Sequence, residues 1–132
     1  MISNKTGASP LGTIYPSPTT RGPYDEDKKS NMSDLLTRNQ FPLPVERQQV
    51  ETDWRTRGYS CAQFVDPPGQ KWMDFVHACN ELVTVVEGRL EMIVADQQYF
   101  MESGDEVFIP KDAVHSVINA HDGVSMWLYG YD

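Results

Sequence analysis

The sequence lacks the features of several large protein classes. It has only two cysteines, Cys61 and Cys79, which are too few for a disulfide scaffold and fit a reducing cytosol, so we expect a cytoplasmic protein. Its apolar runs are only a few residues long, so no segment predicts a membrane span and we expect no membrane partner. No hydrophobic segment follows Lys5, so no secretory signal is visible.

Positive charge is also scarce. The chain has 11 Lys and Arg against 19 Asp and Glu, which gives a net charge of −8 and argues against a nucleic-acid partner. Residues 1–31 carry four basic and three acidic residues (net +1), whereas residues 32–132 carry seven and sixteen (net −9). The acidic part is therefore the part that we expect to fold.

At 132 residues and 39% hydrophobic, the chain is long enough for one domain with one core. Half of residues 1–30 are Gly, Pro, Ser or Thr, so residues 1–31 are predicted to be a disordered or loosely packed tail, with a proline motif for a partner as the alternative. Met32 reads like a natural chain start, which would make the tail an upstream extension.

Residues 32–56 are predicted to be an extended arm with one short helical turn at Leu35–Arg38, capped by Ser33 or Asp34. The prolines of Phe41–Val45 require extended backbone there. We expect this arm to lie across the outside of the domain or against a second subunit.

Residues 57–132 form a domain in which short β-rich segments alternate with turn signals. The spacing predicts about eight strands and no convincing amphipathic helix, which is typical of an all-β sandwich or small barrel. The predicted strands are Gly58–Val65, Lys71–Ala78, Glu81–Glu87, Arg89–Ala95, Tyr99–Met101, Val107–Pro110, His115–Ala120 and Ser125–Tyr131.

Two of the three histidines stand beside residues that suggest chemistry. His77 is predicted to end one strand and Glu81 to begin the next, with both side chains pointing the same way. A glutamate that opens a strand of valines needs a cation or a hydrogen-bond donor if it faces inward. A metal ion bound by imidazole and carboxylate would meet that need. His121 lies in a turn and is expected to be exposed.

The spacing of residues 69–88 resembles the first motif of the cupin family. That motif is a glycine, five residues, His-x-His, three or four residues, Glu, six residues and a glycine. Here Gly69 precedes Phe75-Val76-His77 by five residues, and Glu81 and Gly88 follow at the motif's spacing.

Residues 104–119 resemble the second cupin motif, a glycine, five residues, Pro-x-Gly, two residues, His, three residues and Asn. Here Gly104 leads to Pro110, and His115 and Asn119 follow at the motif's spacing. Asp112 takes the place of the glycine, which is consistent with a turn variant because Asp tolerates unusual backbone angles. The resemblance implies a cupin jelly-roll β-barrel over residues 57–132 that holds a metal at its wide end.

One departure from the first motif changes the expected chemistry. Phe75 replaces the first histidine of the pair, so the resemblance carries over His77, Glu81 and His115 as ligands of one divalent metal ion. Two imidazoles and one carboxylate would suit Fe, Zn, Mn, Ni or Cu. The alternative is a vestigial site in which Phe75 is core filling.

Several other residues are candidates for the pocket. Met73, Phe75 and His77 are predicted to share one face, and Met92 lies on another inward face. Cys79 is either an extra ligand or a small turn residue. Asn119 is either a pocket contact or a structural hydrogen-bond partner. Trp127, Tyr129 and Tyr131 alternate on the last predicted strand. We expect them either to line the pocket or to cover the barrel's outside or a dimer face.

The functional prediction follows from the resemblance and names no catalytic residue. We expect a metal-binding cupin, a homodimer, that binds or converts a small organic ligand, as a non-haem metal dioxygenase, an isomerase or a lyase. The alternatives are a non-catalytic binding or sensing cupin and a structural dimer with a vestigial site.

Overall fold

The structure, a computed structural model, describes residues 35–132; the predicted tail and the expected chain start lie outside them. The elements are β1 (Leu36–Thr37), α2 (Arg47–Thr56), β2 (Ala62–Asp66), β3 (Lys71–Phe75), β4 (Glu81–Glu87), β5 (Arg89–Val94), β6 (Gln97–Glu102), β7 (Glu106–Ile109), β8 (His115–Asn119) and β9 (Ser125–Tyr131).

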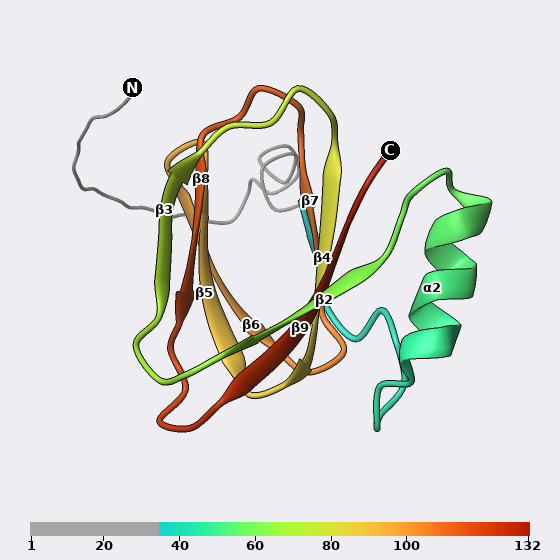
Figure 1. The fold of residues 1–132 in the computed structure, drawn as a ribbon, viewed down its shortest axis with the longest axis horizontal. Coiled ribbons are helices and arrows are strands. Elements are labelled where there is room, and N and C mark those ends of the chain that lie inside the picture. The colour runs from blue at the N-terminus through green and yellow to red at the C-terminus, as the bar shows by residue number, and fades with distance from the viewer. Residues whose placement is uncertain (1–34) are drawn as a thin grey trace, which may run out of the picture. The chain divides into compact units, whose positions relative to one another are not determined.

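The strands form two antiparallel sheets that face each other (Figure 1). One has the order β1-β7-β4-β9-β2 and the other the order β3-β8-β5-β6. Apart from the β5–β6 hairpin, neighbours in each sheet are far apart in the sequence, as in a jelly roll. The predicted all-β jelly-roll class is confirmed. Within the described residues, no helix combines the length and the hydropathy that crossing a membrane requires.

Residues 35–56 differ from their predicted conformation. The expected helical turn at Leu35–Arg38 is instead strand β1, which pairs with β7 through Leu36 and Val107. The ten-residue helix α2 was not predicted. Its last residue is Thr56 and its C-cap is Arg57. Gly58 follows with a φ of +91°, a left-handed conformation that glycine adopts at low cost at the end of a helix.

Helix α2 packs on the outer face of the five-stranded sheet (Figure 1). Val50 and Trp54, four residues apart, are its buried residues and cluster with Leu82 of β4 and Leu128 of β9. Gly130 of β9 lacks a side chain, and a Cβ there would lie 1.8 Å from the carbonyl oxygen of Ser60 and 3.0 Å from the Trp54 ring. Burial of two large side chains therefore holds a helix whose other residues are mostly polar.

Alternation along the strands divides core side chains between two faces. Because Leu82 and Leu128 face the helix, Glu81 and Val83 of β4 and Tyr129 of β9 point the other way, toward the second sheet. Fully buried apolar side chains fill the space between the sheets. They are Val83, Val85, Leu90, Met92, Val94, Met101 and Val107. Met92, a pocket candidate, therefore belongs to this packed core.

Candidate metal centre

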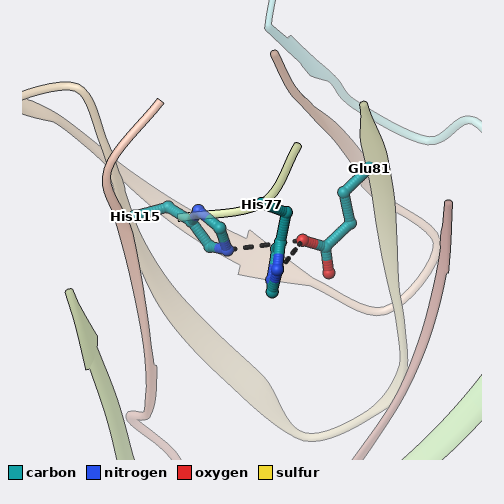
Figure 2. Close-up of side chains that lie close together, drawn as sticks. All are labelled: His77, Glu81 and His115. Carbon is teal, nitrogen blue, oxygen red and sulfur yellow. Dashed lines mark ion pairs between the residues drawn. The ribbon is translucent and has the colours of Figure 1, made fainter. Parts of the chain in front are cut away.

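Three loop-to-strand junctions bring His77, Glu81 and His115 together. His77 follows β3, Glu81 is the first residue of β4 and His115 is the first residue of β8. Figure 2 shows the three side chains converging between the sheets. One potential ligand atom from each lies within 4.8 Å of the other two. Oε1 of Glu81 is 3.3 Å from Nε2 of His115 and 3.7 Å from Nε2 of His77.

Glu81 is the most constrained member of the cluster. It is 4% exposed, and its Oε1 has no hydrogen-bond partner within the described part of the chain despite the nearby imidazoles. A buried carboxylate oxygen without a donor is costly, so its position calls for a cation. Ligand atoms bound to one metal ion at about 2.1 Å lie roughly 3.0–3.5 Å apart, close to the separations of Glu81 Oε1 from the two imidazole nitrogens. The residues present therefore fit a metal ion.

His115 is already oriented for such a role. Its Nδ1 lies 3.0 Å from the carbonyl oxygen of Ala113, which can only accept a hydrogen bond. Nδ1 therefore donates this bond, so in the neutral imidazole Nε2 is the nitrogen that can bind a metal ion. At 3% exposure, the ring is held in place by its surroundings.

The turn before His115 has the backbone conformation that the second motif requires. Asp112, at the position of the motif's glycine, has a φ of +67°. Its backbone N–H donates to the carbonyl oxygen of His77 at 2.8 Å. The substitution thus keeps the left-handed turn, and the turn contacts the segment that carries His77.

Phe75 occupies the position of the motif's first histidine and borders the cluster. It is opposite His115 in the β3–β8 register. Its ring centroid is 6.3 Å from that of His77 and 6.5 Å from that of His115. An apolar ring, 41% exposed, therefore stands where a fourth protein ligand would be expected.

The predicted alternation of Met73, Phe75 and His77 is broken by a β-bulge. Asp74 has a φ of +60°, and the β3–β8 register shifts between Trp72 and Phe75. Trp72 and Phe75 consequently lie on the same side, with ring centroids 6.3 Å apart, and Met73 is 47% exposed. The single-face prediction for Met73 is wrong because an extra residue shifts the strand's alternation.

The sequence left Asn119 open as a pocket contact or a structural hydrogen-bond partner, and its contacts are those of a structural partner. It is 3% exposed, and its Nδ2 is within hydrogen-bond distance of the carbonyl oxygens of Asp66, Pro67 and Gly123. Its Oδ1 accepts from Ser125 Oγ at 2.7 Å and from the backbone N–H of His121. Asn119 therefore joins the 66–70 turn to the 120–124 turn.

Cys79 and His121 lie outside the cluster of potential ligands. Cys79 is a free, half-buried thiol in the turn between His77 and Glu81. His121 is 38% exposed and pairs with Asp122 at 3.7 Å. His121 therefore provides a natural control for experiments on the other two histidines.

Tyr131 is a site residue for which the sequence left three places open: the pocket, the barrel's outside and a dimer face. Its hydroxyl oxygen is 3.3 Å from Nε2 of His77, and it is opposite Glu81 in the β4–β9 register. Burial, with the nearby Glu81 carboxylate, raises the pKa of Tyr131 to about 12. Its phenol is therefore protonated at neutral pH in the metal-free protein. The alternation of Trp127, Tyr129 and Tyr131 was the available signal, but it did not reveal which face they occupy.

Partly exposed aromatic rings continue from the cluster across both sheets. Successive ring centroids are 4.9–6.3 Å apart and close into a loop, here called the ring circuit. Its members are Phe64, Trp72, Phe75, His77, Tyr131 and Tyr129. Phe64 stacks between Trp72 and Tyr129, with interplanar angles of 22° and 17°.

A buried carboxylate fixes the tryptophan side of the ring circuit. Oδ2 of Asp66, which is 2% exposed, accepts hydrogen bonds from Nε1 of Trp72 at 3.0 Å and of Trp127 at 2.9 Å. Both indoles are thereby oriented by one side chain, which holds Trp72, the circuit's one tryptophan, in place.

Comparison with known proteins agrees with this architecture. The sequence profile described as the cupin domain matches residues 63–131. None of the curated proteins matches the chain.

Solved structures with the same fold share limited sequence identity with the chain. The plu4264 protein of Photorhabdus luminescens is 25% identical, with a TM-score of 0.52 over 55% of this chain and 61% of that one. A cupin 2 domain-containing protein of Halorhodospira halophila is 23% identical, with a TM-score of 0.53 over 59% and 57%. A DMSP lyase structure is 21% identical, with a TM-score of 0.52 over 57% and 38%. The matched region spans less than two thirds of each of these proteins.

Proposed function

The chain belongs to the cupin domain family, and from that premise we propose that it holds one divalent metal ion through His77, Glu81 and His115 and uses it to bind or convert a small organic ligand. The observation that carries the proposal is the buried Glu81 Oε1, which lacks a hydrogen-bond donor and lies within 3.7 Å of two imidazole nitrogens. Two histidines and a carboxylate suit Fe, Mn, Ni, Cu or Zn, and affinity alone does not choose among them.

Charge argues for an anionic ligand. A divalent ion and one carboxylate leave a net charge of +1 beside the buried Glu81 and His115, which favours a ligand that supplies a carboxylate or enolate oxygen. When bound, the ion would supply Lewis-acid polarisation of that oxygen. With three protein ligands, a common metal geometry retains positions for such a group.

The chain's own residues would bind the remainder of the ligand. The ring circuit offers flat apolar surface beside His77, suited to stacking against an unsaturated or apolar group. The Tyr131 phenol, protonated at neutral pH in the metal-free protein, can donate a hydrogen bond or a proton to a group bound beside His77. Dioxygenase, isomerase and lyase chemistry all remain compatible with these parts.

A non-catalytic binding or sensing cupin is the second candidate, and Phe75 favours it. An apolar ring at the place of a fourth ligand weakens metal retention while adding apolar contact area for a ligand. Steady-state turnover with metal-loaded protein distinguishes this candidate from an enzyme. The homodimer and the cytoplasmic location stay predictions, and light scattering on purified protein tests the first.

The metal hypothesis is tested by loading the chelator-stripped protein separately with each candidate ion and measuring bound metal by elemental analysis. We expect about one ion per chain in the wild type and in His121→Ala, and loss of that ion in His77→Ala and His115→Ala. The matched control removes the third histidine without touching the cluster. Equal metal content in all four proteins would end the hypothesis.

A further inference from the structure

Asn80 ties together the segments that carry the cluster. Its backbone N–H and its Nδ2 donate to Oδ1 and Oδ2 of Asp132 at 3.0 and 2.8 Å. Its Oδ1 accepts from the backbone N–H of Lys111 at 2.8 Å, and its carbonyl oxygen accepts from the backbone N–H of Asp132 at 3.2 Å. One residue thus makes four hydrogen bonds to two remote segments.

Each of the joined segments adjoins a site residue. Asn80 lies directly before Glu81 and three residues after His77. Asp132 directly follows Tyr131, and Lys111 lies in the turn that leads to His115. The clamp, defined as Asn80 with Asp132, therefore restrains the Glu81 end of the 77–81 segment relative to the segments that carry Tyr131 and His115.

We propose that Asn80 and Asp132 are positioning residues that preorganise His77, Glu81 and His115 for the metal ion, an inference that rests on the proposed metal function. Without the clamp, the 77–80 turn would have to be ordered at the moment the ion binds, and that entropy would be subtracted from the binding free energy. Outer partners of metal ligands characteristically change metal affinity by 10–100-fold when removed.

Exchanging the two side chains tests positioning apart from composition. Asn80→Ala removes the amide. The double variant Asn80→Asp with Asp132→Asn keeps the net charge and can restore every bond. The carboxylate at position 80 can accept from the backbone N–H of Lys111 and from the amide at position 132. The oxygen of that amide can accept from the backbone N–H of residue 80. Asp53→Ala is the matched control. It removes a carboxylate of α2 that accepts an exposed hydrogen bond from Arg57, the C-cap of that helix.

The probe is Co²⁺, whose visible absorption reports both binding and coordination geometry, titrated into chelator-stripped protein; the thermal midpoint of the metal-free protein is measured in parallel. We expect Asn80→Ala to bind Co²⁺ about 10–100-fold more weakly, with a metal-free midpoint no lower than that of Asp53→Ala. We expect the double variant to bind within about threefold of the wild type and to show its spectrum.

Wild-type affinity in Asn80→Ala, or weak binding in a folded double variant, would overturn the clamp while leaving the proposed function intact. If Asn80→Ala does not fold, the double variant decides alone: wild-type affinity supports the clamp and weak binding overturns it. Co²⁺ binding that is absent from the wild type, or unchanged in His77→Ala, would instead overturn the proposed metal function and the clamp with it.

Discussion

Oε1 of Glu81 lies 3.3 Å from Nε2 of His115 across 34 residues of sequence, yet it accepts no hydrogen bond from any residue that the structure describes. A second buried glutamate, Glu106 of β7, is the contrast. Its carboxylate accepts from Nε1 of Trp54 at 2.9 Å and from the guanidinium of Arg57 at 2.7 and 3.0 Å. The two carboxylates are about equally buried, at 4% and 5% exposure, and differ in whether the fold satisfies them.

This contrast predicts that leucine in place of each glutamate changes the free energy of unfolding in opposite directions. In metal-free protein, Glu81→Leu should raise the free energy of unfolding by about 1–3 kcal/mol, because it removes a desolvated acceptor that lacks a donor. Glu106→Leu should lower it by about 1–3 kcal/mol, because it leaves the buried Trp54 N–H without an acceptor, whereas the partly exposed Arg57 keeps Asp53 as a partner. Urea denaturation in the presence of a chelator measures both. A Glu81→Leu protein less stable than the wild type would mean that the fold itself uses Glu81.

Glu81→Leu should also abolish metal binding, so stability and metal binding would change in opposite directions. Elemental analysis of Glu81→Leu after metal loading checks this. Such a trade-off is common where a site retains a locally unfavourable group for its chemistry. Metal retention at the wild-type level in Glu81→Leu would show that the ion binds elsewhere.

Tyr131 makes the stability of the metal-free protein depend on alkaline pH. Burial and the Glu81 carboxylate raise its pKa from 10.0 to about 12 in the folded chain. Between those values the unfolded chain has lost the phenolic proton while the folded chain keeps it, so stability must fall as the pH rises from about 10 to 12. Below about pH 10 both states are protonated and Tyr131 contributes no slope.

Comparison with Tyr131→Phe isolates this contribution from those of the other tyrosines. The variant's stability should fall less steeply over the same range, since phenylalanine cannot ionise. Urea midpoints measured across the window, together with tyrosinate absorbance of the folded proteins, provide the test. Parallel pH profiles for the two proteins would show that Tyr131 ionises at its ordinary pKa.

The sequence was sufficient to predict most strands and the three members of the cluster. Turn residues mark the strand ends, and motif spacing places His77, Glu81 and His115 at three strand junctions that the fold brings within 4.8 Å. Tyr131 could not be assigned to the pocket because its approach to His77 depends on the β4–β9 pairing, in which Tyr131 is opposite Glu81, 50 residues earlier. No local pattern contains that pairing.

Two local surprises have equally specific causes. The sequence of α2 has only Val50 and Trp54 as buried residues, too few for a recognisable amphipathic period, and the helix depends on the sheet that Trp54 contacts. Met73 was misplaced because Asp74 adopts a positive φ, which inserts a bulge that alternation cannot anticipate. Both outcomes are set by tertiary packing.

Asn119→Ala tests the structural role of the last residue of the second motif. The substitution leaves the carbonyl oxygens of Asp66, Pro67 and Gly123 without their shared donor, so we expect a loss of about 2–4 kcal/mol in the free energy of unfolding. Co²⁺ affinity of the folded protein should stay unchanged, because Asn119 makes no contact with the cluster. Weakened metal binding at full stability would instead assign it to the pocket.

Trp54→Ala separates the helix from the site. The indole packs on Leu82 and Leu128 and donates to Glu106, so its removal should cost about 3–5 kcal/mol of stability. Trp54→Phe keeps much of the packing and loses only the hydrogen bond, so a cost of about 1–2 kcal/mol is expected. Thermal and urea unfolding of the two variants measure these values.

The location of Trp54 makes a second readout informative. It contacts the outer face of β4, whereas Glu81 points from the first residue of the same strand toward the opposite sheet. Folded Trp54→Phe should therefore bind Co²⁺ as the wild type does, although its stability is lower. If affinity and stability fell together in this variant, the outer helix would be coupled to the cluster through β4, and the site would depend on the arm as well as on the barrel.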